Sequence, residues 1–212
     1  LHLRQPRPRR RKPAIGWVPL AAERPNQVCA VAFMQDQLCN GQRVRLFNVV
    51  DTHTRESLAT EIDTRINARR ARIVLDEIAH RRGCPEAVTC DNGPEFTSRV
   101  LARWSAARRV RLHFSQPGRP MQNGYIESFN GRMRDECLNL HDFGSVSEIR
   151  AVVTAWREHY NQARPHSSLG GLTPSQAAQR YAAGLEPPAL GHPHTSTVHR
   201  PPARPQPASC LT

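Results

Sequence analysis

The sequence predicts an α/β domain: a mixed five-stranded sheet with helices on both faces. Three strand-like segments follow one another near the beginning, with short connections between them. Two further short strands each follow an amphipathic helix, and two long helices come after the last strand. The expected order is therefore βββ-α-β-α-β-α-α, an antiparallel trio followed by two helix-linked strands.

The antiparallel trio begins with "VCAVAFMQD", residues 28–36, an apolar run of strand length. Asn40-Gly41 follows it, and this dipeptide is a strong short-range signal for a hairpin. Residues 43–51 then predict the second strand and residues 55–62 the third.

Residues 68–82 predict a helix, because apolar side chains recur on one helical face and Gly83 and Pro85 end the pattern. A strand over 87–90 and a helix over about 97–108 follow. Alternation of apolar and polar residues in "VRLHF", 110–114, predicts the fifth strand.

The second half of the sequence predicts helices only. The first runs from Pro120 or Met121 to about Leu138, and its apolar stripe is Ile126, Phe129, Met133 and Cys137. A second helix starts at Ser145, which forms a predicted capping box with Glu148. A short helix starts at Thr173-Pro174, with proline at the first helical position.

Four segments follow from composition. Residues 1–24 form a basic arm that we expect to be disordered, with six Arg or Lys and three prolines within 3–13. Residues 25–165 are the expected core, and 166–184 a C-terminal extension with the short helix. Residues 185–212 are rich in Pro and His without periodicity, which predicts a disordered tail.

The formal net charge of +12 and the pI of about 10.8 point to a polyanionic partner, namely nucleic acid. The sequence has no apolar run long enough to span a membrane and no secretory signal. The six cysteines lack zinc-site spacing, so we expect free thiols in a reducing compartment. These features predict a cytoplasmic, nucleoid-associated protein without a membrane partner.

Two carboxylates are candidates for chemistry. Asp91 ends the fourth strand within "CDNGPEFTS", and Glu127 lies on the helix after the fifth strand. Each has a simpler explanation, since Asp before Asn-Gly is good turn chemistry and a surface Glu is common in helices. If they converge at one sheet edge, they suit hard cations such as Mg2+, which two-metal enzymes use for phosphoryl transfer.

Three long motifs, "CDNGPEFTS", "PGRPMQNGYIESFNGRMRDECLN" and "YNQARPHSSLGGLTPSQA", closely resemble the catalytic domain of bacterial insertion-sequence transposases. The subgroup is the two-reading-frame DDE type, with a retroviral-integrase-like core, and the resemblance covers roughly residues 24–180. Thirty-five residues separate Asp91 from Glu127, as in the family's pattern. The resemblance implies an RNase H-like fold and a DDE triad holding two Mg2+ or Mn2+ ions. It also implies hydrolytic nicking of element ends and strand transfer by the freed 3′-OH.

The sequence departs from the family at the first acid of the triad. The family has a stretch resembling Trp-Ser-Met-Asp-Phe where this chain reads Cys-Ala-Val-Ala-Phe, so Ala32 occupies the position of the first catalytic Asp. Asp36 is on the same face of the strand but roughly 13 Å along it. Asp51 ends the neighbouring strand, so neither acid is expected to replace the missing one.

Several polar residues are candidates for DNA contact. The loop before the Glu127 helix and the helix itself offer phosphate or base contacts, with ordinary loop polarity or pairing with Asp135 or Glu136 as the alternatives. The basic arm adds a run that can follow phosphates. The candidates are Arg119, Gln122, Asn123, Asn130, Arg132 and Arg134, together with Arg9, Arg10, Arg11 and Lys12.

The sequence therefore predicts a transposase or integrase catalytic domain that is impaired by Ala32. The alternatives are a catalytically dead DNA-binding remnant and an RNase H-like nuclease or basic RNA binder. We expect DNA as partner, a homo-oligomer on DNA, and two Mg2+ or Mn2+ ions if the site were complete. No helix-turn-helix is visible before residue 25, so end recognition would need an upstream-frame product or another N-terminal segment.

Overall fold

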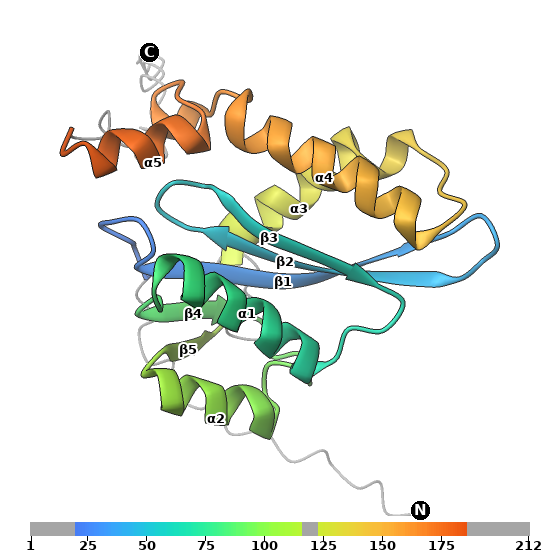
Figure 1. The fold of residues 1–212 in the computed structure, drawn as a ribbon, viewed down its shortest axis with the longest axis horizontal. Helices are drawn as coiled ribbons and strands as arrows, with labels where there is room; N and C mark the ends of the chain where they lie inside the picture. Colours follow the sequence, from blue (N-terminus) through green and yellow to red (C-terminus); the bar gives the residue numbers. More distant parts are fainter. Residues whose placement is uncertain (1–19, 116–122, 186–212) are drawn as a thin grey trace, which may run out of the picture.

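The computed structural model describes residues 20–115 and 123–185 (Figure 1). Its centre is a five-stranded sheet in the order β3-β2-β1-β4-β5. β1, β2 and β3 are antiparallel neighbours, whereas β4 and β5 run parallel to β1. The mixed sheet predicted from the sequence is confirmed; its strands are β1 (Val28–Gln37), β2 (Arg43–Asp51), β3 (Ser57–Asp63), β4 (Ala87–Cys90) and β5 (Arg111–Phe114).

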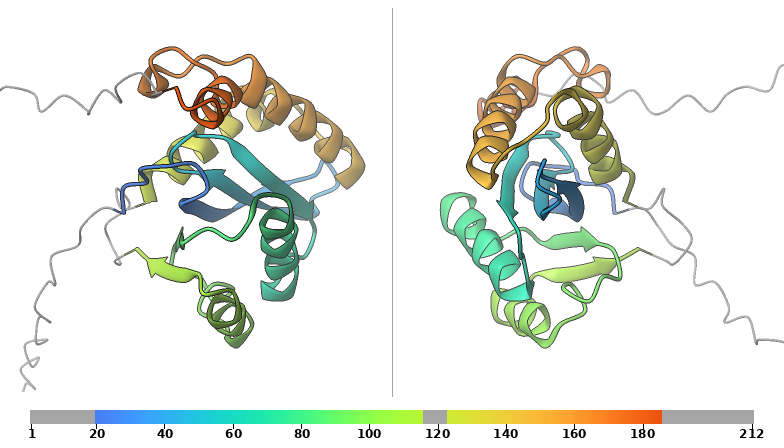
Figure 2. Two further views of the ribbon diagram at one scale, coloured as in Figure 1. Left: turned by 60° about the vertical axis from the view of Figure 1, so that its left-hand side comes forward. Right: turned by 90° about the vertical axis from the view of Figure 1, so that its right-hand side faces the viewer.

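Helices cover both faces of this sheet (Figure 2). On one face, α1 and α2 share an apolar cluster with the sheet. On the other, α3 and α4 share a second cluster, and α5 packs against α4. The helices are α1 (Ala68–Arg82), α2 (Arg99–Arg108), α3 (Gly124–Glu136), α4 (Val146–Gln162) and α5 (Pro174–Ala182), with short 3-10 turns η2 (Leu138–Leu140) and η3 (Ser167–Leu169).

The alternation of side chains along β1 decides which residues face which helices. Ala30, Ala32 and Met34 lie in the cluster with α3 and α4. Cys29 and Val31 lie in the cluster with α1 and α2. Position 32 therefore faces α3, the helix that carries Glu127.

Three local predictions differ from the structure. The helix predicted to end near Leu138 ends at Glu136, and residues 120–122 of its predicted start lie outside the described residues. The third strand begins at Ser57 rather than at residue 55, because Arg55 adopts a left-handed conformation (φ 64°) and belongs to the preceding turn. At the start of α4, one of the two hydrogen bonds of the predicted capping box is present. The Ser145 hydroxyl accepts from the Glu148 N–H, but the Glu148 carboxylate accepts from Gly144, one residue earlier than predicted.

The buried carboxylate of Asp51 organises the turn after β2. It is fully buried and accepts backbone N–H bonds from Asn26 (2.6 Å), His53 (2.8 Å) and Thr54 (3.1 Å). Because these donors satisfy the charge, Asp51 ties the chain entering β1 to the β2–β3 turn.

Other predictions concern cysteines, the C-terminal helices and membranes. The five cysteines within the described residues are free thiols, as expected. The helix at Thr173-Pro174 is confirmed, and here the capping box is complete. None of the helices within 20–115 and 123–185 is long and apolar enough to cross a membrane.

His166, in the "RPH" motif, is 4% exposed and packs edge-on against Tyr160, so it lies against the core. Burial, together with the nearby guanidinium groups of Arg132, Arg164 and Arg55, lowers the pKa of His166 from 6.5 to about 4. The imidazole is therefore neutral in the folded protein near pH 7.

This burial predicts a pH-dependent stability. The folded pKa lies below the unfolded value, so on acidification the unfolded chain takes up the proton first. His166 stabilises the fold above pH 6.5, and this contribution is lost as the pH falls from 6.5 to about 4. The free energy of unfolding should fall by about 2 to 3 kcal/mol over that window because of this residue.

Urea unfolding at a series of pH values measures this effect. His166→Gln, which is neutral at every pH, should flatten the profile between pH 6.5 and 4. His159→Gln, at an exposed position of α4, is the matched control and should keep the wild-type slope. Equal slopes for His166→Gln and the wild type would contradict the assignment.

Candidate active site

The loop after β4 presents Asp91 at the end of the strand. The side chain is exposed, and one carboxylate oxygen accepts the N–H of Gly93 at 2.8 Å. Asn92 donates to the carbonyl oxygen of Ser115 at 2.6 Å, and Ser115 N–H binds the carbonyl of Cys90. The turn preference that favours Asp-Asn-Gly is therefore real, and it fixes the carboxylate at the strand end.

Gly93 is needed for space rather than for backbone conformation. Its φ is not positive, so the left-handed region is not what calls for glycine here. A Cβ at this position would lie 2.8 Å from the Asp91 carboxylate oxygen, closer than real Cβ contacts. Any larger residue would therefore displace Asp91 from its turn.

An aromatic cluster holds the same loop on the sheet. Phe96 is 2% exposed and lies against Phe33 and Phe47, with ring centroids 5.3 and 6.1 Å away. Beside it, Glu95 pairs with Arg45 at 2.7 Å, and that guanidinium lies over the Phe33 ring. Glu95 thus has a structural partner, and the loop that carries Asp91 is anchored from both β1 and β2.

Position 32 lies beside this loop in the sheet register. Ala30 of β1 pairs with Thr89 of the parallel strand β4, so two residues further along each strand Ala32 is level with Asp91. On the other side of β1, Ala32 pairs with Asn48 of β2. Ala32 is 8% exposed and belongs to the apolar cluster under α3, so no oxygen donor projects from β1 at this point.

Asn123 joins the two strands to the start of α3. It is 6% exposed and gives α3 no side-chain cap. Its side-chain oxygen accepts the Thr89 hydroxyl at 3.3 Å, and its side-chain nitrogen donates to the Val31 carbonyl at 3.4 Å. The Asn123 amide therefore contacts Val31, directly before position 32, and Thr89, two residues before Asp91.

Glu127 lies one helical turn, about 6 Å, beyond Asn123 along α3. Its side chain is exposed in the first turn of the helix. Partial burial raises the pKa of the Glu127 carboxyl above its usual value. Since Asn123 holds the start of α3 against β1 and β4, Glu127 lies one turn from the two strands that carry position 32 and lead to Asp91.

A buried polar contact continues along the same helix. Asn48, fully buried, donates to the side-chain oxygen of Asn130 at 2.8 Å, three residues after Glu127. The Asn48 oxygen has no hydrogen-bond partner among the described residues. The Asn48 amide therefore helps to fix the position of α3 above β2, and it does so beside Ala32, its neighbour in the sheet.

The donor set does not fit a two-ion site. Asp91 and Glu127 offer the hard oxygens that Mg2+ or Mn2+ prefer. The third member that the family pattern requires is a methyl group at Ala32. Within 20–115 and 123–185 no cluster of three His, Cys, Asp or Glu side chains could hold a metal ion.

Neither alternative acid lies at the site. Asp36 faces Val44 four residues further along β1, where its carboxylate accepts from its neighbour Gln37. Asp51 lies opposite Cys29, three residues before position 32, and its oxygens are occupied by the backbone donors of its turn. The expectation that neither replaces the missing acid is consistent with these positions.

The predicted DNA-contact residues of α3 all have partners inside the protein. Arg132 hydrogen-bonds the Tyr160 side chain, and Arg134 donates to the Gln35 carbonyl at 3.0 Å. Asn130 accepts from Asn48. Arg119, Gln122 and the arm residues Arg9, Arg10, Arg11 and Lys12 lie outside the described residues.

Comparison with known proteins identifies the family of this chain. Two models, both described as integrase core domain, match residues 22–120 and 108–174. The chain belongs to the integrase core domain family. The two matches together span the described sheet, the Asp91 loop and α3, and they confirm the family resemblance seen in the sequence motifs.

Insertion-element proteins from two bacteria share almost half of their aligned residues with this chain. The chain is 47% identical over 165 residues to the IS407 uncharacterized 31.7 kDa protein of Burkholderia multivorans, covering 78% of this chain and 60% of the relative. It is 46% identical over 162 residues to the IS476 uncharacterized 39.2 kDa protein of Xanthomonas euvesicatoria, covering 76% and 47%. This chain thus spans about half to three fifths of their lengths.

Solved integrase structures share the fold. A chain of the simian T-cell lymphotropic virus intasome superimposes with a TM-score of 0.62 at 18% identity, covering 89% of this chain and 61% of that chain. The HTLV-2 integrase catalytic core domain in complex with magnesium gives 0.56 at 16% identity, covering 72% and 95%. The predicted RNase H-like fold is confirmed.

Sequence reasoning missed the positioning roles of Asn48, Thr89 and Asn123. The sequence predicts Asn123 as a DNA contact, whereas its amide is buried and bonded within the fold. A usable signal exists for Asn48, which is a single polar residue within the apolar run "LFNVV". A buried amide in a strand must find a partner, and here the partner is on α3.

Removing the Asn123 amide should loosen α3 from the sheet. Asn123→Ala leaves the buried Thr89 hydroxyl and the Val31 carbonyl without this partner, so we expect a loss of about 1 to 2 kcal/mol in unfolding free energy. Urea unfolding followed by circular dichroism measures it. Asn139→Ala, at an exposed position of η2, should cost far less, and equal losses would count against the bridge.

Proposed function

We propose that this chain is a transposase catalytic domain that binds DNA but whose metal-dependent strand transfer is reduced by orders of magnitude. The observation that carries the proposal is Ala32, which is level with Asp91 in the sheet and faces α3, where the family places its first acid. The family membership and the insertion-element relatives support the class of reaction.

Asp91 and Glu127 are the proposed metal ligands. With a third carboxylate at position 32, the site would suit the Mg2+ or Mn2+ ions that such enzymes use for phosphoryl transfer on DNA. The comparison with a magnesium-bound integrase core supports the choice of metal. With a methyl group at position 32, the chain offers two carboxylates where the family pattern has three.

DNA is the proposed partner. The charge of +12, the basic arm and the loop residues Arg119 and Gln122 support backbone contacts that do not depend on position 32. Asn123 we assign instead to positioning α3. Homo-oligomers are supported by the trimeric and dimeric forms of the HTLV-2 core, and an upstream-frame product or N-terminal segment would supply recognition of the element ends.

A DNA-binding remnant without catalysis is the second candidate, and Ala32 favours it. Such a chain would compete with intact copies at the element ends. An RNase H-like nuclease is a third candidate that shares the fold. Cleavage of RNA–DNA hybrids by the unmodified chain would favour it over both transposase candidates.

Restoring the acid tests the proposal. Ala32→Asp supplies a third carboxylate beside Asp91, so Mn2+ binding measured by titration calorimetry should become tighter than in the wild type. Metal-dependent joining of labelled DNA ends should rise by on the order of 100-fold or more.

Two controls isolate the carboxylate. Ala32→Asn adds similar volume without charge and should gain neither Mn2+ affinity nor joining. Ala32→Asp combined with Glu127→Gln should lose the gain. If Ala32→Asp binds no more Mn2+ and joins no more DNA than the wild type, position 32 is not the missing ligand.

A further inference from the structure

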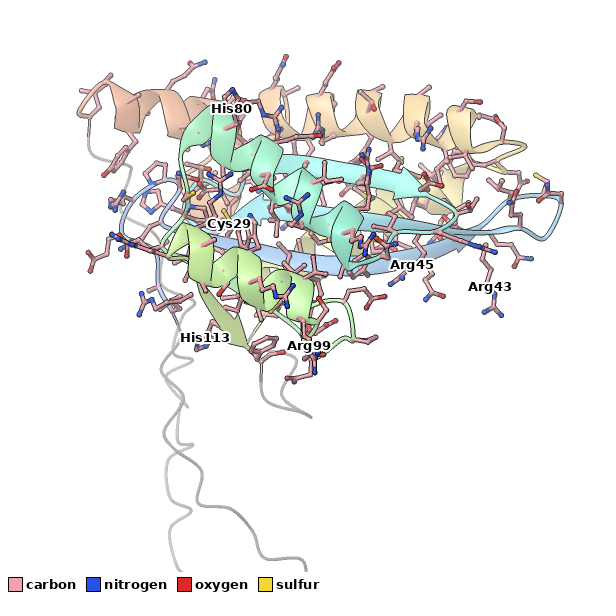
Figure 3. The ribbon with its side chains drawn as sticks, turned by 60° about the horizontal axis from the view of Figure 1, so that its bottom comes forward. Cys29, Arg43, Arg45, His80, Arg99 and His113 are labelled. Atoms are coloured by element: carbon pink, nitrogen blue, oxygen red, sulfur yellow. The ribbon has the colours of Figure 1, made fainter. Side chains whose placement is uncertain are left out.

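Positive charge gathers on the α1–α2 face of the sheet, away from α3. Figure 3 views this face, with His80 on α1 and Arg99 at the start of α2 labelled. Between them α1, α2 and the α2 cap carry nine arginines but two acids, Asp76 and Glu77. By contrast α3 carries Arg132 and Arg134 against three acids, Glu127, Asp135 and Glu136.

Arginines without a partner concentrate at the same place. Within 20–115 and 123–185, nine arginines make no ion pair and no side-chain hydrogen bond. Six of them lie on α1, on α2 or directly after α2: Arg69, Arg81, Arg99, Arg103, Arg109 and Arg111. The other three, Arg43, Arg65 and Arg180, are scattered over β2, the β3–α1 turn and α5.

The surface between α1 and α2 is hollowed. Two adjoining hollows of about 600 Å³ each share Arg72, Ile73, Asp76 and Arg108 in their walls. The unpaired arginines Arg69 and Arg103 line one of them, and Arg81 lines the other. Together the hollows form one basic groove that we call the α1–α2 groove.

Two acids, Asp76 and Glu77, line the groove, and Asp76 is already paired with arginines. Asp76 pairs with Arg72 at 2.5 Å and with Arg108 at 3.0 Å, and it accepts the indole N–H of Trp104 at 2.9 Å. It therefore fixes two guanidinium groups in the groove wall and leaves a net positive charge. Arginine rows of this kind suit phosphate oxygens, which they bind through paired N–H donors.

We propose that the α1–α2 groove binds the phosphate backbone of duplex DNA. The DNA segment bound there is distinct from the DNA segment that would lie at Asp91 and Glu127. The groove and α3 lie on opposite faces of the sheet, each packed on its own apolar cluster. The groove needs no metal and is independent of Ala32. It rests on the proposed function in one respect, the identification of the polyanion as DNA.

The salt dependence of binding tests the groove. Arg69→Gln, Arg81→Gln and Arg103→Gln are combined in the full chain, because all three are exposed, line the groove and have no partner to lose. Binding of a short fluorescein-labelled duplex is followed by anisotropy over a range of NaCl concentrations without divalent metal. Each lost phosphate contact should lower the slope of log K against log[salt] by about 0.9, so a fall of about 2 to 3 is expected.

A matched control separates a site from general charge. Arg43→Gln, Arg65→Gln and Arg180→Gln together remove the same charge from exposed, unpaired arginines outside the groove, and should leave the slope nearly unchanged. The lysine triple Arg69→Lys, Arg81→Lys and Arg103→Lys keeps the charge and should keep most of the slope.

Equal falls in slope for the two glutamine triples, or no fall for the groove triple, would overturn the proposal. A groove triple that changes the sedimentation mass but not the slope would also overturn it, since the groove would then bind another copy of the chain. If the groove triple does not fold, the single variants decide: Arg103→Gln should lower the slope by about 0.9 and Arg180→Gln should leave it unchanged, and equal slopes for the two would overturn the proposal. Failure of Ala32→Asp to gain Mn2+ affinity leaves this experiment untouched, so the two proposals fail separately.

Discussion

The amide of Asn123 is the contact on which the candidate site depends. A helix that follows a sheet strand across a long connection can settle at many heights and rotations over that sheet. Here one buried side chain binds β1 through the Val31 carbonyl and β4 through the Thr89 hydroxyl, just before the first turn of α3. Asn48 repeats the connection from β2 to Asn130, two turns along. The two amides fix where Glu127 stands relative to the strand ends.

The contacts that hold the Asp91 loop and α3 in place do not depend on the side chain at position 32. The Asp91 loop is held by Phe96, Glu95 and the Asn92 bond to Ser115, none of which involves position 32. An alanine in β1 therefore leaves the strand, the loop and the helix in place. The chain thus retains the framework of an integrase core with a methyl group at position 32.

Much of this arrangement could be predicted from the sequence. The periodicity of apolar residues, together with the turn residues, indicated the strands, the helices and the mixed sheet. The sequence motifs indicated Asp91 and Glu127 as candidate site residues and Ala32 as a departure from the family pattern. What could not be predicted were contacts between distant elements: the partner of Asn48, the burial of Asn123 and the pairing of Glu95 with Arg45. Local patterns carry no information about such partners. A polar residue in a loop is equally compatible with DNA contact and with a bridge inside the fold, and the structure shows such a bridge at Asn123.

The apolar surroundings of Ala32 have a consequence for the balance between activity and robustness. An acid at this position would add a carboxylate level with Asp91, and the two would repel one another until cations neutralised them. This chain is free of that repulsion and places a methyl group in the cluster that contains Ile126 and Met133 instead. The stability of its native state should consequently depend little on divalent ions, and chelators should leave it nearly unchanged.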